Sequence, residues 1–532
     1  MSLVRNTATI GGFTLISRIL GLVRDVLMAR FVGAGFASDA FLVAWRLPNL
    51  FRALFAEGAF ASAFVPMFNR TIAEAERGAE GETNGQDGLP AGRRFAEDVL
   101  SVLFPFLAVF TTLVMLVPGP VVWAITFGFR ESGGAEKLAL ATELTRITFP
   151  YLMLISLVSL LGGILNSLGR FWVNAAAPVL LNLCMIAGLI FFRGATGIDT
   201  ARTQAIAVNV SGVAQLAWLI WSCRRAGIVL RLKRPQLTPQ VRKLLVIIWP
   251  AAIGAGAVQF NLMISTMLAS GFLGEGAVSY LYYADRLNQL PLGLIGIGVG
   301  TAILPALSRQ IGSGNDGAAV HTQNRAIELS LLLTLPATVA LMLSATPLVR
   351  GLFQGLRFTA EATEGCAAAL TAFSFGLPAY ILIKVLTPGF YARSDTRTPV
   401  RIAMIAMVAN LALNLGFVFL TPLGYVGLAF STAAAAWLNV AMLYITLRRR
   451  NHFAVDAQLA RRTVRLGAAS VAMGAVLLLL NPLIDPYTAG PIPIRAAALT
   501  ALIAAGTLTY AAAAFLFRAF SLAELKGLRK RG

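Results

Sequence analysis

The sequence predicts an all-α membrane protein with fourteen transmembrane helices. Of its 532 residues, 57% are hydrophobic and only 13% are charged, and the mean hydropathy is +0.74. Soluble domains are about 25% charged, so this composition indicates a protein that lies in a bilayer. The apolar residues also gather into fourteen segments, each long enough to span a membrane, which takes about 20 residues.

The fourteen segments follow one another with mostly short connections. Their centres are expected near Leu20, Leu54, Leu107, Leu154, Leu183, Leu216, Gly256, Ile295, Leu333, Ile381, Leu411, Ala436, Met473 and Ala504. The first segment contains charged residues, whereas a cleaved signal peptide has an uncharged apolar core, so we expect it to remain as a helix. One long polar connection, residues 69–97, is rich in Gly, Glu and Asn, and we expect it to be cytoplasmic.

The net charge of +20 has a topological explanation. Lys and Arg concentrate in the cytoplasmic loops of membrane proteins. The densest basic loops are residues 224–243 and 448–465, so these loops are expected on the cytoplasmic side. With fourteen spans, an even number, both termini fall on the same side of the membrane as these loops. The sequence therefore predicts that both termini are cytoplasmic, and nucleic-acid binding is not expected.

A weak internal repeat indicates how the helices are grouped. Residues 46–66 run from an arginine to a proline through an apolar segment, and residues 286–305 repeat this pattern. Two lobes of six helices are predicted, over 1–226 and 227–455, and two additional helices over 456–532. Repeats with an even number of helices share one orientation, and transporters of this kind bind substrate between the repeats.

Several arginines interrupt the apolar segments. An ionised side chain at the bilayer centre costs at least about 2.5 kcal/mol, so it rarely occurs without a function. An excess of guanidinium groups favours a phosphate or pyrophosphate ligand, which arginine binds bidentately. The candidates for this substrate contact are Arg18, Arg24, Arg52 and Arg286.

Other charges fit a structural alternative, in which ion pairs between helices fix the bundle. Asp39, Arg46 and Glu57 fall on one face of the second segment at about 100° per residue. Asp25 shares a face with Arg18 in the first segment, which leaves both readings open there. The candidates for a supporting or ion-pairing role are Asp25, Asp39, Arg46, Glu57, Asp285 and Lys384.

Catalytic chemistry finds no support in the motifs. The two histidines, His321 and His452, fall in predicted loops, and the three cysteines are too widely spaced for a metal site. A nucleotide-binding GxxxxGK[ST] loop is absent from the sequence. We therefore expect a transporter without a cofactor or metal, rather than an enzyme.

Four long motifs resemble the MurJ/MviN family, which belongs to the multidrug/oligosaccharidyl-lipid/polysaccharide exporter superfamily. They are residues 17–25 (SRILGLVRD), 46–66 (RLPNLFRALFAEGAFASAFVP), 282–287 (YYADRL) and 388–399 (PGFYARSDTRTP). Their order and spacing match the family, and the resemblance extends over essentially the whole chain.

The resemblance implies a flippase that moves lipid II, an undecaprenyl-pyrophosphate-linked peptidoglycan precursor, across the bacterial inner membrane. It implies a cationic cavity between the lobes, a hydrophobic groove for the lipid tail on the last two helices, and alternating access. The cavity arginines of the family correspond to Arg18, Arg24, Arg52 and Arg286, and its functional aspartate to Asp39. Lipid II, membrane lipids and the cell-wall synthesis machinery are the expected partners, and a monomer is the expected working unit.

Two points stay open. Some family members carry an acidic residue in the seventh helix as part of a sodium site, but residues 250–270 contain no carboxylate here. Sodium coupling is therefore not carried over, and drive by the membrane potential is an alternative. The rival functions are a flippase for another polyprenyl-pyrophosphate glycan, a cation-coupled multidrug exporter and a membrane scaffold.

Overall fold

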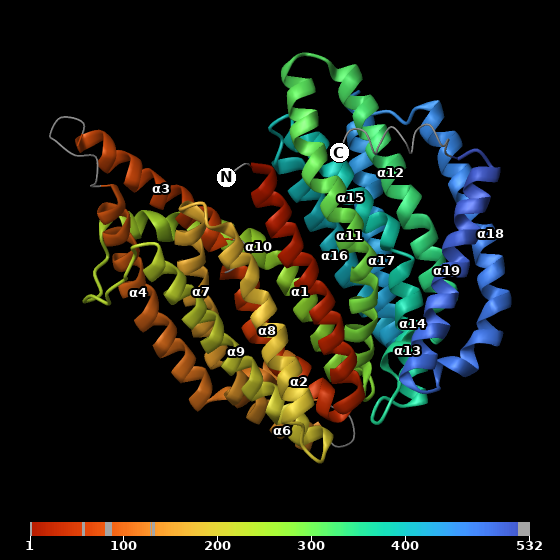
Figure 1. The fold of residues 1–532 in the computed structure, drawn as a ribbon, viewed down its shortest axis with the longest axis horizontal. Helices are drawn as coiled ribbons and strands as arrows, with labels where there is room; N and C mark the ends of the chain where they lie inside the picture. The colour runs from red at the N-terminus through yellow and green to blue at the C-terminus, as the bar shows by residue number, and fades with distance from the viewer. Residues whose placement is uncertain (1–2, 56–58, 80–87, 128, 130–133, 520–532) are drawn as a thin grey trace. The chain divides into compact units, whose positions relative to one another are not determined.

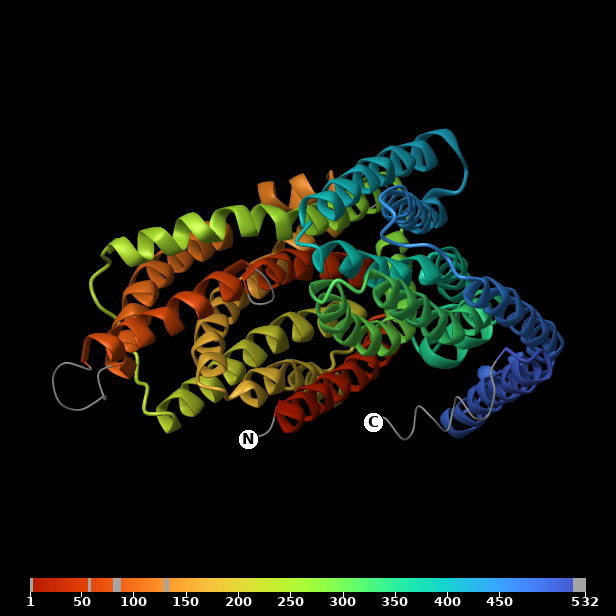
Figure 2. The same ribbon diagram turned by 90° about the horizontal axis from the view of Figure 1, so that it is seen from above.

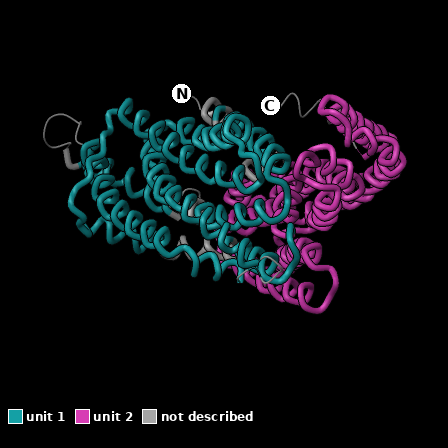
Figure 3. Tube along the Cα trace, turned by 90° about the horizontal axis from the view of Figure 1, so that it is seen from below, with its two compact units in different colours: residues 1–276 teal, residues 277–532 magenta. Residues whose placement is uncertain are grey.

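The computed structural model describes residues 3–55, 59–79, 88–127, 129 and 134–519. The regular structure in these residues consists of nineteen helices, with no strand among them (Figures 1 and 2). The all-α class predicted from composition is thereby confirmed. The chain forms two compact units, Met1–Gly276 and Ala277–Gly532 (Figure 3).

Unit 1 contains α1 to α10. Their bounds are α1 Leu3–Phe31, α2 Phe36–Phe55, α3 Ala59–Ala79, α4 Gly88–Leu116, α5 Pro118–Thr126, α6 Gly134–Thr148, α7 Pro150–Ser167, α8 Phe171–Phe191, α9 Gly197–Arg225 and α10 Pro239–Phe272. Prolines lie inside α2, α3, α4 and α8, where each removes one backbone hydrogen bond and favours a bend.

The helices of unit 1 pack as a layered bundle. In it α1 packs on α8, α8 on α9, α9 on α7, and α2 on α6. Between α3 and α4, Phe64 is fully buried and stacks on Phe95 with ring centroids 5.6 Å apart. Gly163 of α7 lies so close to Phe64 that an added Cβ would be 3.0 Å from the ring. Aromatic packing of this density fixes α3 between its neighbours.

Helix α10 belongs to unit 1 by its packing, because it contacts α2, α3 and α5. The predicted lobe boundary at 226–227 comes from a sequence repeat, which is a different criterion from compactness. The lobes 1–226 and 227–455 and the segment 456–532 therefore remain a prediction about the repeat.

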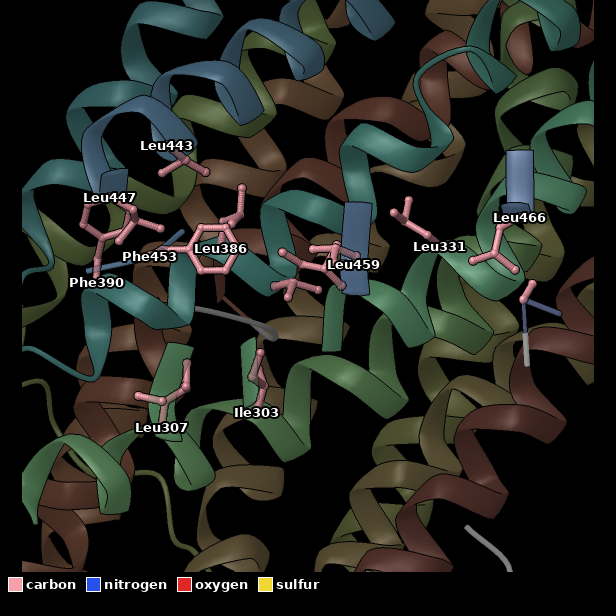
Figure 4. Packing of buried hydrophobic residues seen from close by; sticks show 14 of the residues in the cluster. Ile303, Leu307, Leu331, Leu386, Phe390, Leu443, Leu447, Phe453, Leu459 and Leu466 are labelled. Carbon is pink, nitrogen blue, oxygen red and sulfur yellow. The ribbon is translucent and has the colours of Figure 1, made fainter. Parts of the chain in front are cut away.

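Unit 2 contains α11 to α19. Their bounds are α11 Ala277–Gly312, α12 Asp316–Leu343, α13 Ala345–Phe353, α14 Ala360–Ser374, α15 Leu377–Tyr391, α16 Arg397–Leu420, α17 Gly424–Arg449, α18 Ala457–Thr488 and α19 Ile492–Leu516. Its core includes a cluster to which α11 contributes Ile303 and Leu307, α15 contributes Leu386 and Phe390, and α18 contributes Leu466 (Figure 4).

The last two helices, α18 and α19, lie side by side (Figures 1 and 2), and α18 also packs on α12. Met473 and Leu477 of α18 meet Leu502 of α19 in a buried cluster. The pairing of α12 with α18 is also electrostatic, since buried Glu328 forms ion pairs with Arg325 and with Arg462. These two helices are therefore anchored within unit 2.

Ten spans of the described residues are long and apolar enough to cross a membrane. Each of the fourteen expected centres lies on a helix, including those on α1, α2, α10 and α11, which are absent from the ten. Multi-pass membrane architecture is thus established, while the count of fourteen spans stays a prediction.

Candidate functional site

Arg24 of α1 is buried and bound by its own neighbour. Its Nη2 lies 2.7 Å from Oδ1 of Asp25, and its Nε donates to the same oxygen at 3.0 Å. Its Nη1 donates to Oδ1 of Asn182 in α8 at 3.0 Å. Adjacent residues on a helix point about 100° apart, and the long arginine side chain bridges that angle. Asp25, which was expected to share a helix face with Arg18, thus forms an ion pair with its neighbour Arg24.

Asn182 also binds α1 at a second place. Its Nδ2 donates to the backbone oxygen of Ser17 at 2.9 Å. A buried amide that uses both ends in this way leaves little polar surface unsatisfied. Arg18, the next residue along α1, is exposed, so its guanidinium is accessible to an anion in a way that the Arg24 guanidinium is not.

Asp39 lies in the first turn of α2, where the helix dipole favours a negative charge. Its Oδ2 is 2.9 Å from Nζ of Lys137 in α6 and accepts the backbone N–H of Gly276, also at 2.9 Å. The adjoining Glu275 accepts the backbone N–H of Phe36 through Oε1 at 2.7 Å. The N-terminus of α2 is therefore tied to the segment that follows α10.

Lys137 is the functional candidate that sequence reasoning missed. It lies near the start of α6, and its side chain is almost fully buried, with Nζ 5.0 Å from the ring centre of Phe129. Its sequence neighbourhood is polar and reads as a loop. The one available signal was Asp39, because a buried carboxylate requires a positive partner.

The rest of the predicted charge stripe on α2 is less complete. Arg46 donates from Nη2 to the backbone oxygen of Leu262 in α10 at 3.0 Å, so it does help to hold two helices together. Glu57 and the side chain of Arg52 lie outside the described residues. Their predicted roles, as stripe member and as substrate contact, therefore stay predictions.

In unit 2, Arg286 lies on α11 beside a small polar cluster. Its guanidinium carbon is 4.8 Å from the ring centre of Tyr282, a cation–π geometry. Its Nη1 donates to Oε1 of Gln289 at 3.5 Å, and Gln289 in turn donates to Asp285. Gln289 thus connects two adjacent charges that point in different directions.

Helix α15 carries two further polar groups of unit 2. Lys384 is exposed, whereas the hydroxyl of Tyr380, one turn earlier, is buried without a hydrogen-bond partner among the described residues.

Within each unit the structure brings some of the predicted residues together. Arg24 pairs directly with Asp25, and Arg286 is connected to Asp285 through Gln289. A clamp of all four arginines combines residues of both units and remains a prediction.

A metal centre finds no candidate in the described part of the chain, where no three His, Cys, Asp or Glu side chains gather as ligands. Residues 250–270 contain no carboxylate, and in this stretch Asn261 has a buried oxygen without a described partner. Thr266 donates its hydroxyl to the backbone oxygen of Leu262 at 2.9 Å. This region therefore offers amide and hydroxyl oxygens.

The fold is shared with helical transporters. A solved structure described as lipid II flippase MurJ in an inward closed conformation matches with a TM-score of 0.74, at 23% identity, over 96% of this chain and 98% of that one. An inward-facing multidrug resistance MATE family transporter of the MOP superfamily matches with a TM-score of 0.61, at 17% identity, over 83% and 97%. Fold and buried charges together define a multi-pass, all-helical membrane protein that carries ion pairs inside its helix bundle.

The sequence comparisons identify the family within that class. The family model described as "Lipid II flippase MurJ" matches residues 28–496. A probable lipid II flippase MurJ of Rhizobium tropici is 45% identical over 490 residues, 91% of this chain and 88% of the relative. One of Rhizobium meliloti is 42% identical over 538 residues, 100% and 97%, and one of Vibrio cholerae is 40% identical over 521, 96% and 95%. The chain belongs to the lipid II flippase MurJ family.

Proposed function

We propose that this protein flips lipid II from the cytoplasmic to the periplasmic leaflet of the bacterial inner membrane, with both termini in the cytoplasm. The observation that carries the proposal is family membership over residues 28–496. Relatives that match nearly the whole chain bear the name "Probable lipid II flippase MurJ". The arginines inside the helices supply the chemistry, because guanidinium groups bind pyrophosphate oxygens bidentately.

The substrate pyrophosphate docks, in this proposal, on Arg18, Arg24, Arg52 and Arg286. The exposed guanidinium of Arg18 meets the anion first. Arg24 is held by Asp25 at 2.7 Å, so the pyrophosphate replaces Asp25 as its partner. A ligand shifts a conformational equilibrium only if it binds one state better than the other. In this proposal, the exchange of the Arg24 partner supplies the difference in affinity between the open and the occluded state. Once the pyrophosphate has replaced Asp25, the Asp25 carboxylate makes a different contact in the occluded state.

The proposed cycle is alternating access by a monomer. The sugar–peptide headgroup crosses in the polar cavity, while the lipid tail stays in the bilayer or along α18 and α19. Leu478, Leu483 and Ile503 are exposed on these two helices, as a surface for an acyl or prenyl chain requires. Movement of the substrate's charge through the membrane potential is the proposed drive, since one charge through 100 mV is worth about 2.3 kcal/mol.

The decisive experiment is complementation in a cell depleted of its own lipid II flippase. We expect the wild-type chain to clear lipid II from the cytoplasmic leaflet, measured by accessibility of the headgroup to an external modifying enzyme in spheroplasts. Arg18→Gln and Arg286→Gln should abolish clearance at unchanged protein level. Arg202→Gln is the matched control, because Arg202 is a partly exposed arginine paired with Glu143 at 2.7 Å and lies outside the proposed clamp.

Each rival predicts a different result. Clearance of another polyprenyl-pyrophosphate glycan but not of lipid II would favour the first rival. Drug efflux that requires the buried carboxylates but not the arginines would favour a multidrug exporter. A scaffold would lose protein level or assembly, rather than flipping, when the arginines are neutralised. Normal lipid II clearance by the arginine variants would refute the pyrophosphate clamp.

A further inference from the structure

The connection between α9 and α10 carries a charged surface that the proposed function leaves unused. Between residues 224 and 243 the chain has no Asp or Glu. The exposed cations of this stretch are Arg224, Arg225, Arg231, Lys233, Arg234, Arg242 and Lys243. Basic clusters next to transmembrane helices attract anionic headgroups, and each cation near the surface strengthens that attraction.

The connection is held in place by α4. Glu97 accepts the backbone N–H of Arg231 at 3.1 Å and lies 2.8 Å from Nζ of Lys233. The backbone N–H of Lys233 also donates to Oγ of Ser101 at 3.0 Å. The chain then enters α10 through a capped start, with Thr238 accepting from the backbone N–H of Val241 at 3.3 Å. The surface is therefore preorganised, which lowers the entropic cost of binding.

Apolar side chains border the cations directly. A hollow of about 570 Å³ at the start of α10 is lined by Leu237, Pro239, Arg242, Lys243, Val246 and Ile247. Leu237 is 69% exposed and Val246 is 67% exposed. Such large apolar side chains beside two cations suit an amphiphile, which offers an anion and a hydrocarbon chain together. A nucleic acid or a free anion would leave the apolar half of this hollow in water.

The C-terminal end of α9 indicates the depth of this surface. The guanidinium carbon of Arg225 lies 4.1 Å from the ring centre of Trp221, which stacks on Trp218 with centroids 5.3 Å apart. Tryptophan is enriched where headgroups meet acyl chains. The cations that follow Trp221 in sequence are thus expected at headgroup level.

We propose that residues 229–247 bind an acidic phospholipid of the leaflet that the proposed function makes cytoplasmic. Arg242 and Lys243 hold the lipid phosphate, and Leu237, Val246 and Ile247 contact the first part of its acyl chains. The acids nearest to this surface are already engaged: Glu97 and Asp98 face Lys233, and Glu74 is hydrogen-bonded to Arg70 at 2.6 Å. A phosphate therefore meets a surface whose remaining charge is positive.

The test uses the full chain in nanodiscs and does not depend on flipping. An environment-sensitive fluorophore is attached at Gln236→Cys, in a Cys184→Ser background because Cys184 is the one native cysteine that is not buried. Quenching is measured with brominated phosphatidylglycerol or brominated phosphatidylcholine at equal mole fraction. We expect stronger, saturable quenching by phosphatidylglycerol, and an enrichment about thirty-fold lower in the Arg242→Gln/Lys243→Gln variant, as two surface cations predict.

The matched control is Arg448→Gln/Arg449→Gln, which removes the same charge from two exposed residues at the end of α17. It should keep the wild-type enrichment. Equal quenching by the two lipids in the wild type overturns the proposal, and so does an equal loss in the control variant, which would indicate net charge alone. Displacement of the lipid by an equal concentration of glycerol phosphate also overturns it, because the site would then bind a free anion.

Discussion

The carboxylate of Asp39 and the ammonium of Lys137 lie 2.9 Å apart, with 1% and 3% of their side chains exposed. One residue comes from the first turn of α2 and the other from the first turns of α6. Two opposite charges are therefore withdrawn from water together, and each makes the burial of the other tolerable.

Neutralising one member of this pair should destabilise unit 1. Asp39→Asn removes the carboxylate that lies 2.9 Å from the buried ammonium of Lys137, which costs about 3–5 kcal/mol. Lys137→Met removes the ammonium from beside the buried carboxylate, at a similar cost. The double variant should recover a large part of the loss. Thermal unfolding of the purified single and double variants measures this coupling, and strictly additive losses would contradict it.

Glu328 should fasten α18 to α12 in unit 2. Its buried carboxylate forms ion pairs with Arg325 and Arg462, and Arg325 also pairs with Asp456. Glu328→Gln therefore removes the carboxylate that α12 offers to Arg462 of α18, at a cost of about 3 kcal/mol. Hydrogen exchange along α18 should accelerate. Glu74→Gln is the control, because the pair of Glu74 with Arg70 is exposed to solvent, where an ion pair adds little to stability. Equal effects of the two substitutions would count against a fastening role.

Gly376 should tolerate no side chain. A Cβ at this position would lie 2.8 Å from both Cα and Cβ of Ala433 in α17, and a backbone atom cannot rotate away. Gly376→Ala is expected to cost about 1–3 kcal/mol through overpacking. Gly416→Ala in α16 meets nothing within 4 Å and should be neutral or stabilising by up to about 1 kcal/mol. Unfolding temperatures that rank the two variants the other way would refute this packing argument.

His452, in the connection between α17 and α18, should make stability depend on pH. Burial and the charges of Arg393 and Arg450 lower the pKa of His452 below its ordinary value of 6.5. The unfolded chain therefore takes up a proton at higher pH than the folded chain does. The contribution to stability is present above the unfolded pKa and is lost as pH falls through the folded pKa. The unfolding temperature of the wild type should decrease when the pH is lowered from about 7.5 to about 5.5, and the decrease should be smaller in His452→Gln. An equal decrease in the variant would show that His452 is not the source of the pH dependence.

The fold class followed from the sequence because apolar length and low charge leave few alternatives to a helical bundle. The positions of the expected centres hold for the same reason. Packing units follow another criterion: contacts place α10 with α2 and α3, and the repeat-based boundary at 226–227 remains a prediction that these contacts do not test. The hydrophobic pattern of a helix shows that one of its faces is buried, but it does not show which other helix covers that face.

The candidate site was predictable where charges stand inside apolar runs, as Arg24 and Asp39 do. Their partners were not, because Asn182 is 158 residues from Arg24 and Lys137 is 98 residues from Asp39. A neutral amide carries no signal of this role in the sequence. Lys137 was hidden for another reason, since its polar neighbours resemble a loop although the side chain is buried.

Asn182 has a mechanical consequence. It accepts from Arg24 and donates to Ser17, residues that are seven positions apart on α1, a distance of about 10 Å along the axis. One amide thereby registers α1 against α8 at two points. Sliding or turning α1 by a single residue relative to α8 breaks both hydrogen bonds at once. Small displacements of α1 are therefore resisted, and α1 can shift only by losing both bonds together. During transport, α8 therefore either moves together with α1 as one rigid unit, or the two helices separate in one cooperative step.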